Sequence, residues 1–293
     1  MFSGSLVAIA TPMRPDGALD LAAWTRLIDF HLQSGTSGVV VAGTTGESAT
    51  LTEAEVRELT ERACAQAAGR IAVIAGAGTS STAVTVERAR SLSQLPVDAL
   101  LVVTPAYNRP TQEGLYRHFE AVARVTRVPI ILYNVPSRTA VDMLPETVAR
   151  LSRLERIVGV KEAVADLARI RRLAELCRPG FEILSGDDAT ACQSVLAGAA
   201  GVISVTANVA PAAMARVMAA AARGERERAC ELDAPLEGLH RALFLEANPI
   251  PVKWALARMG LIERSIRLPL TELAEAHHAA VAAALRTGGA IGG

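Results

Sequence analysis

Lysine is nearly absent from this chain of 293 residues. The sequence has 30 basic residues, but only Lys161 and Lys253 are lysines, and the other 28 are arginines. Arginine keeps its charge at any physiological pH, whereas a lysine amine can lose its proton and act as a nucleophile. Lys161 and Lys253 are therefore the only side chains that can supply a nucleophilic amine.

Other scarcities exclude whole classes of protein. The net charge is zero and no basic stripe is interleaved with aromatic residues, which argues against a nucleic-acid-binding protein. The five histidines lack metal-ligand spacing, and the four cysteines form no C-x-x-C pair. We therefore expect reduced cysteines, no bound metal and a cytoplasmic location.

No segment predicts a secretory signal or a membrane span. The first charged residue is Arg14, so the basic start of a signal peptide is missing. The stretch from Ala189 to Ala215 is uncharged for 27 residues, but it contains Gln193, Asn208 and Pro211. We interpret this stretch as helix, strand and turn, and expect no contact with a membrane.

What is present is a repeated pattern of apolar runs. Eight such runs begin 21 to 33 residues apart: Leu6–Ala10, Gly38–Ala42, Ile71–Ala75, Ala99–Val103, Pro129–Tyr133, Ile157–Lys161, Phe181–Ser185 and Val202–Val205. A helical pattern fills each gap, as in Glu53–Ala68, which opens on the capping box of Thr52 and Glu55. Strands that alternate with helices imply a parallel sheet covered on both faces. Eight units predict a (β/α)8 TIM barrel over residues 1–223, with a doubly wound open sheet as the alternative.

The pattern changes after Gly224. Only helices are expected there, at 225–245, 251–259 and 271–285. Residues 224–293 are therefore predicted to form a C-terminal α-helical extension, packed on the barrel or on a neighbouring subunit. Lys253 lies in this extension, and we expect it to have a structural role.

Lys161 ends the sixth apolar run. The β-branched residues of this run predict a buried strand, whose alternation places Ile157, Gly159 and Lys161 on one face, with Gly159 leaving space beside the lysine. Burial disfavours the ammonium form, and a neutral amine can attack a carbonyl to form a Schiff base. The alternative is an arginine-favouring gene in which Lys161 extends from a strand end to water. The lysine alone does not decide between these hypotheses.

Other reactive groups follow the predicted strands, at the end of a barrel where active sites lie. Two of the three tyrosines, Tyr107 and Tyr133, come at the fourth and fifth strands, and a phenol can transfer protons to an imine precursor. Arg138 follows the fifth strand and either binds a substrate carboxylate or forms a surface ion pair. Asp187 and Asp188, after the seventh strand, are expected to cap the next helix.

The loop Gly43–Glu47 follows the second strand. Its glycines and hydroxyls suit a carboxylate ligand, although an ordinary glycine turn is the alternative.

Seven motifs together carry a resemblance to a known family. They are Val39–Thr50, Thr104–Pro110, Ile131–Thr139, Gly159–Ala163, Leu184–Asp188, Gly201–Asn208 and Asn248–Trp254. With these motifs the chain resembles the dihydrodipicolinate synthase / N-acetylneuraminate lyase family over nearly its whole length.

The resemblance implies a mechanism. Lys161 would form a Schiff base with pyruvate, while Tyr133 shuttles protons. Thr44 would link Tyr133 to Tyr107, which reaches across from a neighbouring subunit.

The resemblance also implies the substrates and the assembly. Thr45 would bind the pyruvate carboxylate, and the backbones around Gly186 and Ile203 would complete the pocket. Arg138 would bind the carboxylate of L-aspartate 4-semialdehyde, whose condensation with pyruvate gives 4-hydroxy-tetrahydrodipicolinate on the route to diaminopimelate and lysine. The family further implies a homotetramer built as a dimer of dimers, with no metal or organic cofactor.

Some positions depart from the family pattern. Lysine-inhibited relatives carry histidines where this chain has Glu53 and Val56, and other polar groups at Ser80, Val84 and Ala106. We therefore expect weak or absent feedback inhibition by lysine. Two alternative functions stay open: a pyruvate-dependent aldolase or lyase acting on a sugar acid or hydroxy-oxo acid, and a non-catalytic keto-acid-binding relative.

Overall fold

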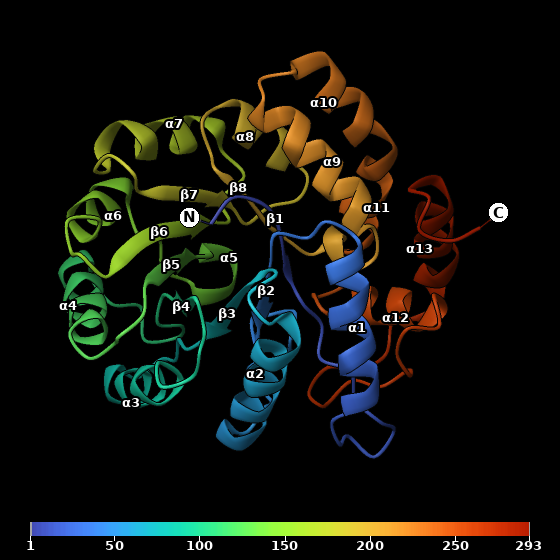
Figure 1. Ribbon diagram of the computed structural model, residues 1–293, viewed down its shortest axis with the longest axis horizontal. Helices are drawn as coiled ribbons and strands as arrows, with labels where there is room; N and C mark the ends of the chain where they lie inside the picture. The colour runs from blue at the N-terminus through green and yellow to red at the C-terminus, as the bar shows by residue number, and fades with distance from the viewer. Residues whose placement is uncertain (1, 293) are drawn as a thin grey trace.

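Eight parallel strands close into a barrel in the computed structural model, which describes residues 2–292 (Figure 1). The strands follow one another in chain order, and β1 pairs with β8 to close the ring. Their bounds are β1 Gly4–Ala8, β2 Gly38–Val41, β3 Ala72–Gly76, β4 Ala99–Val103, β5 Ile130–Asn134, β6 Ile157–Glu162, β7 Glu182–Ser185 and β8 Gly201–Ser204. The prediction of a (β/α)8 TIM barrel is confirmed.

Helices surround the barrel (Figure 1). They are α1 Leu21–Gln33, α2 Glu53–Ala67, α3 Thr82–Leu92, α4 Gln112–Ala123, α6 Pro145–Leu151, α7 Leu167–Leu176, α8 Ala191–Leu196 and α9 Pro211–Ala222. The short helix α5 Pro136–Thr139 lies near the centre of the same view, and a 3-10 turn η1 follows β8 at Thr206–Asn208. The capping box of α2 is formed: the Glu55 amide donates to Thr52 Oγ1 at 3.2 Å, and the Thr52 amide donates to Glu55 Oε2 at 2.8 Å. This reciprocal pair satisfies two amides that the first turn of a helix leaves free.

The C-terminal extension contains α10 Arg226–Asp233, η2 Ala234–Leu236, α11 Glu237–Ala242, α12 Ile250–Arg258 and α13 Glu275–Thr287. The prediction of one continuous helix over residues 225–245 is wrong. Pro235 lacks the amide hydrogen that an uninterrupted helix needs, and the chain makes a 3-10 turn there. Helix α10 packs on α9, the last helix of the barrel (Figure 1).

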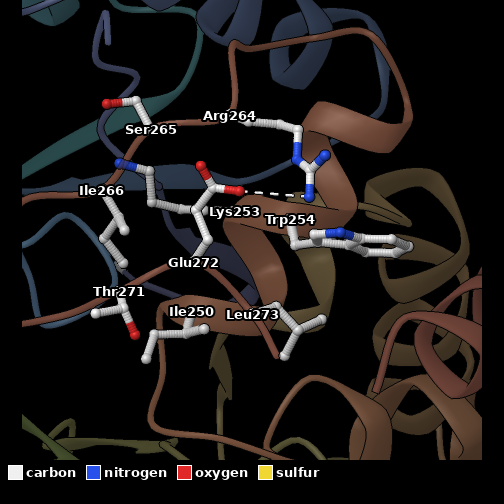
Figure 2. Close-up of a pocket in the computed structure, with 9 residues that line it drawn as sticks. All are labelled: Ile250, Lys253, Trp254, Arg264, Ser265, Ile266, Thr271, Glu272 and Leu273. Atoms are coloured by element: carbon white, nitrogen blue, oxygen red, sulfur yellow. Dashed lines mark ion pairs between the residues drawn. The ribbon is translucent and has the colours of Figure 1, made fainter. Parts of the chain in front are cut away.

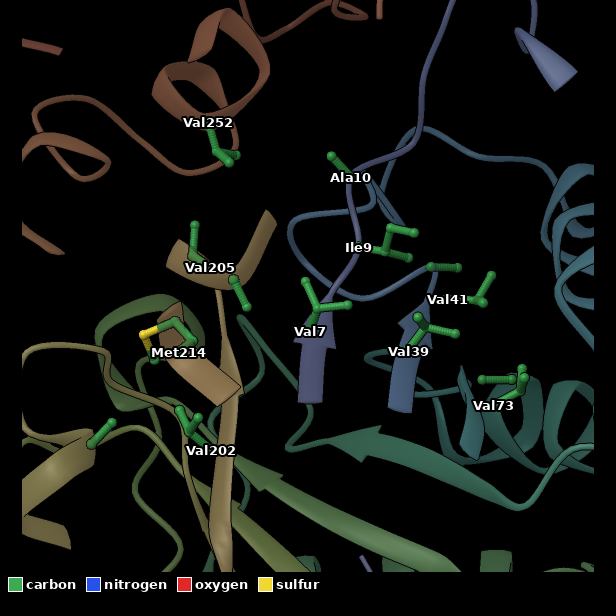
Figure 3. Close-up of a cluster of buried hydrophobic side chains, with 14 of the residues drawn as sticks. Val7, Ile9, Ala10, Val39, Val41, Val73, Val202, Val205, Met214 and Val252 are labelled. Atoms are coloured by element: carbon green, nitrogen blue, oxygen red, sulfur yellow. The ribbon is translucent and has the colours of Figure 1, made fainter. Parts of the chain in front are cut away.

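Two apolar clusters stabilise the barrel. The inner cluster lies inside the ring of strands and includes Leu6, Val40, Ile74, Leu101, Ile131, Tyr133, Leu184 and Ile203. The outer cluster lies between the strands and the helices, and Figure 3 shows Val7, Val39 and Val202 of the strands together with Met214 of α9 and Val252 of α12. The extension therefore shares the outer cluster with the barrel. The division into a barrel of residues 1–223 and an extension of residues 224–293 stays a prediction.

Strand β6 contains an irregularity. Ile130 of β5 lies opposite Ile157, but Ile131 lies opposite Gly159, so Val158 is an extra residue. Ile157 packs in the outer cluster, while Val158 packs against the inner one. The prediction that Ile157 shares a face with Lys161 is therefore wrong, because the extra residue changes the alternation.

No helix within residues 2–292 is long and apolar enough to cross a membrane.

Candidate active site

Lys161 and Tyr133 lie side by side at the carboxyl ends of β6 and β5. The two residues are directly opposite in the strand register, and Lys161 Nζ is 4.5 Å from the centre of the Tyr133 ring. Their exposed fractions are only 5% and 6%. Strand pairing thus brings a buried amine and a phenol together from positions far apart in the sequence.

Gly186 and Ile203 are near this pair. A Cβ atom on Gly186 would lie 3.1 Å from Lys161 Cε and 2.9 Å from the Ala163 methyl group. Ile203 is 1% exposed and belongs to the same inner cluster as Tyr133. The absence of a side chain at position 186 is therefore what leaves room for the lysine.

The prediction that Gly159 leaves space beside Lys161 is wrong, and this position needs a glycine for another reason. A Cβ atom there would lie 2.7 Å from the carbonyl oxygen of Glu182 on β7. The glycine permits close approach of two strands, and the space beside Lys161 comes from Gly186 instead.

Asn248 connects two of the predicted substrate-binding residues. Its Nδ2 donates to Thr45 Oγ1 at 3.0 Å, and its carbonyl oxygen accepts from Arg138 Nη2 at 3.1 Å. Asn248 Oδ1 is buried and has no hydrogen-bond partner among residues 2–292. No feature of the sequence marks Asn248 as a site residue by itself, although it lies in a motif with Pro249 and Pro251.

An ion pair between Glu47 and Lys253 anchors the loop that contains Thr44 and Thr45. The side chains of Glu47 and Lys253 are 1% and 4% exposed, and Glu47 Oε2 also accepts from the Arg267 amide at 3.1 Å. Burial lowers the pKa of Lys253, an effect that the Glu47 carboxylate opposes. These contacts support a structural role for Lys253, since a paired ammonium is a poor nucleophile.

A cavity beside Lys253 lies within the extension (Figure 2). It is lined by Ile250, Lys253, Trp254, Arg264, Ser265, Ile266, Thr271, Glu272 and Leu273. Arg264 and Glu272 form an ion pair of 3.3 Å at its edge, and neither Lys161 nor Tyr133 contributes to the lining.

A polar network lies behind the reactive pair. Because strand residues alternate, Asn134 and Glu162 point away from the side of Tyr133 and Lys161. Asn134 Nδ2 donates to Glu162 Oε1 at 3.0 Å, and Arg169 Nε donates to Glu162 Oε2 at 2.8 Å. Burial raises the pKa of Glu162, although Arg169 opposes the shift. The network connects β5 to β6 at the level of the amine and the phenol.

The predicted proton relay is not assembled within one chain. Tyr107, in the loop after β4, has a side chain that is 94% exposed, and its φ angle is 73°. Within the part of the chain that the structure describes, no hydrogen bond joins Thr44 to either tyrosine. A metal has no evident place here either, since residues 2–292 contain no group of three His, Cys, Asp or Glu side chains suited to one ion.

Comparisons with known proteins show the family of this chain. The model of the dihydrodipicolinate synthetase family matches residues 1–287. A 4-hydroxy-tetrahydrodipicolinate synthase of Methylococcus capsulatus is 53% identical over 291 residues, covering 99% of this chain and 100% of the relative. A synthase of the same name from Thioalkalivibrio sulfidiphilus is 54% identical over 289 residues, covering 99% and 98%.

A solved structure is similar over the same length. The chloride-inhibited dihydrodipicolinate synthase of Acinetobacter baumannii, complexed with pyruvate, superposes with a TM-score of 0.98 at 45% identity, covering 99% of this chain and 100% of that one. The chain belongs to the dihydrodipicolinate synthetase family.

Proposed function

We propose that this chain is a lyase that condenses pyruvate with L-aspartate 4-semialdehyde to 4-hydroxy-tetrahydrodipicolinate, on the route to diaminopimelate and lysine. The observation that carries the proposal is the buried Lys161 amine, 4.5 Å from the centre of the Tyr133 ring, in a member of this family. No residue other than a lysine or a terminal amine forms a Schiff base with a keto acid.

The chemistry follows from these two groups. Lys161 Nζ attacks C2 of pyruvate, and the carbinolamine loses water to give an imine once Tyr133 has supplied a proton to the leaving hydroxyl. Loss of a proton from C3 then gives an enamine, whose C3 attacks the aldehyde carbon of the second substrate. The amino group of the added semialdehyde then attacks C2 of the imine and displaces the Lys161 amine, which closes the ring of the product and frees Lys161.

The other site residues bind and orient the substrates. Thr45 donates to the pyruvate carboxylate, and the backbones at Gly186 and Ile203 complete the pocket. Arg138, at the mouth of the site, binds the carboxylate of the semialdehyde, for which a planar guanidinium is well suited. The hydrogen bonds from Asn248 to Thr45 and from Arg138 to Asn248 support a common mouth for both substrates.

A second chain completes the proton relay in this proposal. Thr44 passes protons between Tyr133 and the Tyr107 of a neighbouring copy, in a homotetramer arranged as a dimer of dimers. The high exposure of Tyr107 supports this arrangement, because a large aromatic side chain is costly to leave in water. We further propose a cytoplasmic location and catalysis without a metal or an organic cofactor.

Trapping with borohydride tests the proposal directly. Incubation with pyruvate and borohydride is expected to add the mass of reduced pyruvate to the peptide that contains Lys161. Lys161→Arg should give no adduct, and Tyr133→Phe should give the adduct more slowly. Absence of an adduct on the native chain would contradict the catalytic proposal and favour a keto-acid-binding relative.

Substrate choice is tested at Arg138. Arg138→Ala is expected to raise KM for aspartate semialdehyde strongly while pyruvate trapping continues, because only the second carboxylate loses its partner. Turnover of a sugar acid in preference to the semialdehyde would instead support the alternative lyase.

Weak regulation by lysine is part of the proposal. Glu53 and Val56 replace the histidines of lysine-inhibited relatives, so the charged ends of lysine lack partners. Activity is expected to persist at lysine concentrations of about 1 mM, which is well above the range of a tight regulatory ligand. Half-inhibition below that concentration would contradict this part of the proposal.

A further inference from the structure

The ladder between β7 and β8 is short. Among residues 2–292, this ladder pairs only Leu184 with Gly201 and Ser185 with Val202. Gly186 and Ile203, the two backbone positions of the proposed pyruvate pocket, lie just beyond the last pair. Each is still bonded on its other side, Gly186 to β6 and Ile203 to β1. The junction between β7 and β8 is therefore weakly joined at the position of the pocket.

Asp188 bridges this junction. Its Oδ2 accepts hydrogen bonds from the amides of Val205 and Thr206, at 2.8 and 2.9 Å, and the residue is 2% exposed. The expectation that Asp188 caps α8 is wrong. Of the two side chains, that of Asp187 interacts with the start of the helix, accepting from the Thr190 amide at 3.0 Å, while Asp188 contributes only its backbone carbonyl, which accepts from the Ala191 amide at 3.2 Å. Asp188 instead turns toward the segment after β8.

The extension contacts the same segment. His240 Nδ1 is 2.9 Å from Thr206 Oγ1, and His240 Nε2 is 3.2 Å from Asp233 Oδ1. Burial works to lower the pKa of His240, but the carboxylates of Asp233, Asp188 and Asp187 outweigh it and the pKa is raised. His240 and Asp188 therefore both hold the segment after β8, His240 at the Thr206 side chain and Asp188 at the backbone amides of Val205 and Thr206.

We propose that Asp188 is a positioning residue for the condensation. By joining the segment after β7 to the segment after β8, it keeps Gly186 and Ile203 at the spacing that pyruvate needs when bound to Lys161. Asp188 faces backbone amides outside the inner cluster, so its effect reaches the substrate through the strand ends. This inference rests on the proposed function.

Two substitutions of Asp188 separate the effect of its hydrogen bonds from the effect of its negative charge. Asp188→Ala removes the acceptor, and we expect KM for pyruvate to rise about tenfold, a change of the size that follows from losing charge-assisted hydrogen bonds. Asp188→Asn keeps an oxygen that can accept from both amides but loses the charge, so we expect KM to rise about twofold. In both variants KM for pyruvate should change more than kcat, and pyruvate trapping on Lys161 should slow in the same order.

Asp98 provides the matched control. Its Oδ2 accepts from the Val73 amide at 2.7 Å, which is the same kind of bond but at the opposite end of the barrel. Asp98→Ala should lower the free energy of unfolding without a change in KM for pyruvate. A role of Asp188 in stability alone would give the same result at both positions.

The outcomes distinguish the inference from the function on which it rests. If the native chain forms no adduct, the proposed function and this inference both fail. If the native chain forms the adduct and Asp188→Ala has the KM of Asp98→Ala, only the inference fails. If Asp188→Ala does not fold, Asp188→Ser decides, because its shorter side chain cannot reach both amides, and a KM equal to that of the native chain overturns the inference.

Discussion

Lys161 has space for its long side chain because Gly186 stands across the junction between β6 and β7. Three atoms, Lys161 Cε and the Cα and Cβ of Ala163, lie within 3.1 Å of the place where a Cβ on Gly186 would be. Real Cβ atoms are seldom this close to a neighbour, so either the amine or the backbone must move. The absence of a methyl group at position 186 therefore determines where the Lys161 amine can lie.

Gly186→Ala tests this connection. We expect pyruvate trapping on Lys161 to slow at least about tenfold, because a displacement of the amine of about 1 Å is enough to disturb attack. The free energy of unfolding should fall by only about 1–3 kcal/mol, as is usual for one added methyl group. Gly238→Ala is a control, because a Cβ there would make only an ordinary contact of 3.8 Å with the Ala284 methyl group. Unchanged trapping in Gly186→Ala would contradict the steric argument.

Two buried histidines predict how stability depends on pH. Burial lowers the pKa of His31 to about 3 and that of His118 to about 4, from 6.5 in the unfolded chain. Below pH 6.5 the two histidines therefore bind protons in the unfolded chain but stay neutral in the folded chain until the pH reaches their lowered pKa values. The stability from this effect is complete above pH 6.5 and is lost as the pH falls.

At about pH 5 each histidine should have lost about 2 kcal/mol of this contribution. Urea unfolding of the native chain and of His118→Gln at about pH 7.5 and about pH 5 measures the difference, since the variant has no imidazole to titrate. The variant should lose less stability on acidification than the native chain. Equal losses would contradict the assignment to His118.

Local backbone hydrogen bonding decides where the helices of this chain begin and end. The capping box of Thr52 and Glu55 was visible in the sequence and is formed. Pro235 breaks the predicted long helix into α10, η2 and α11, a consequence of proline that the apolar periodicity concealed. The extra residue Val158 was not predictable, because a bulge depends on the pairing of β6 with β5 rather than on either strand alone.

The ion pair of Glu47 and Lys253 connects two elements, the loop after β2 and helix α12. Lys253→Met leaves the buried carboxylate without its partner and should lower the free energy of unfolding by about 3–5 kcal/mol. The double variant Glu47→Gln, Lys253→Met should recover part of that loss, since no unpaired charge remains.

Arg264 and Glu272 form the matched control for this pair (Figure 2). Their side chains are 56% and 54% exposed, and Arg264→Ala should cost less than about 1 kcal/mol. Urea unfolding measures all of these variants. A loss for Lys253→Met as small as that for Arg264→Ala would contradict a stabilising role for the buried pair.

At the scale of the whole molecule, Tyr107, one of the proposed catalytic residues, lies on the outer surface. Tyr107 is 94% exposed, whereas Lys161 and Tyr133 are inside the barrel mouth. Under the proposed function this separation is resolved only when a second copy contributes Tyr107 to the site. Assembly then becomes a condition for full activity rather than a matter of stability alone.

Mixed assemblies test this condition. Lys161→Ala and Tyr107→Phe should each have low activity alone, but co-expression should restore about a quarter of native activity. Half of randomly formed dimers are mixed, and each of these has one site with both native residues. Activity of the mixture no greater than the mean of the two variants would contradict a contribution from the neighbouring subunit.

The spacing of apolar runs and helix signals was enough to predict the barrel, because each βα unit is specified by local alternation and capping. The candidate residues Lys161 and Tyr133 were likewise visible, since their types are rare in this chain and fall at strand ends. Only the tertiary structure shows three contacts around the site: Gly186 against the side chain of Lys161, Asn248 between Thr45 and Arg138, and Asp188 against the segment after β8. Their partners are distant in the sequence, and contacts of that kind depend on how the closed ring and its extension pack together.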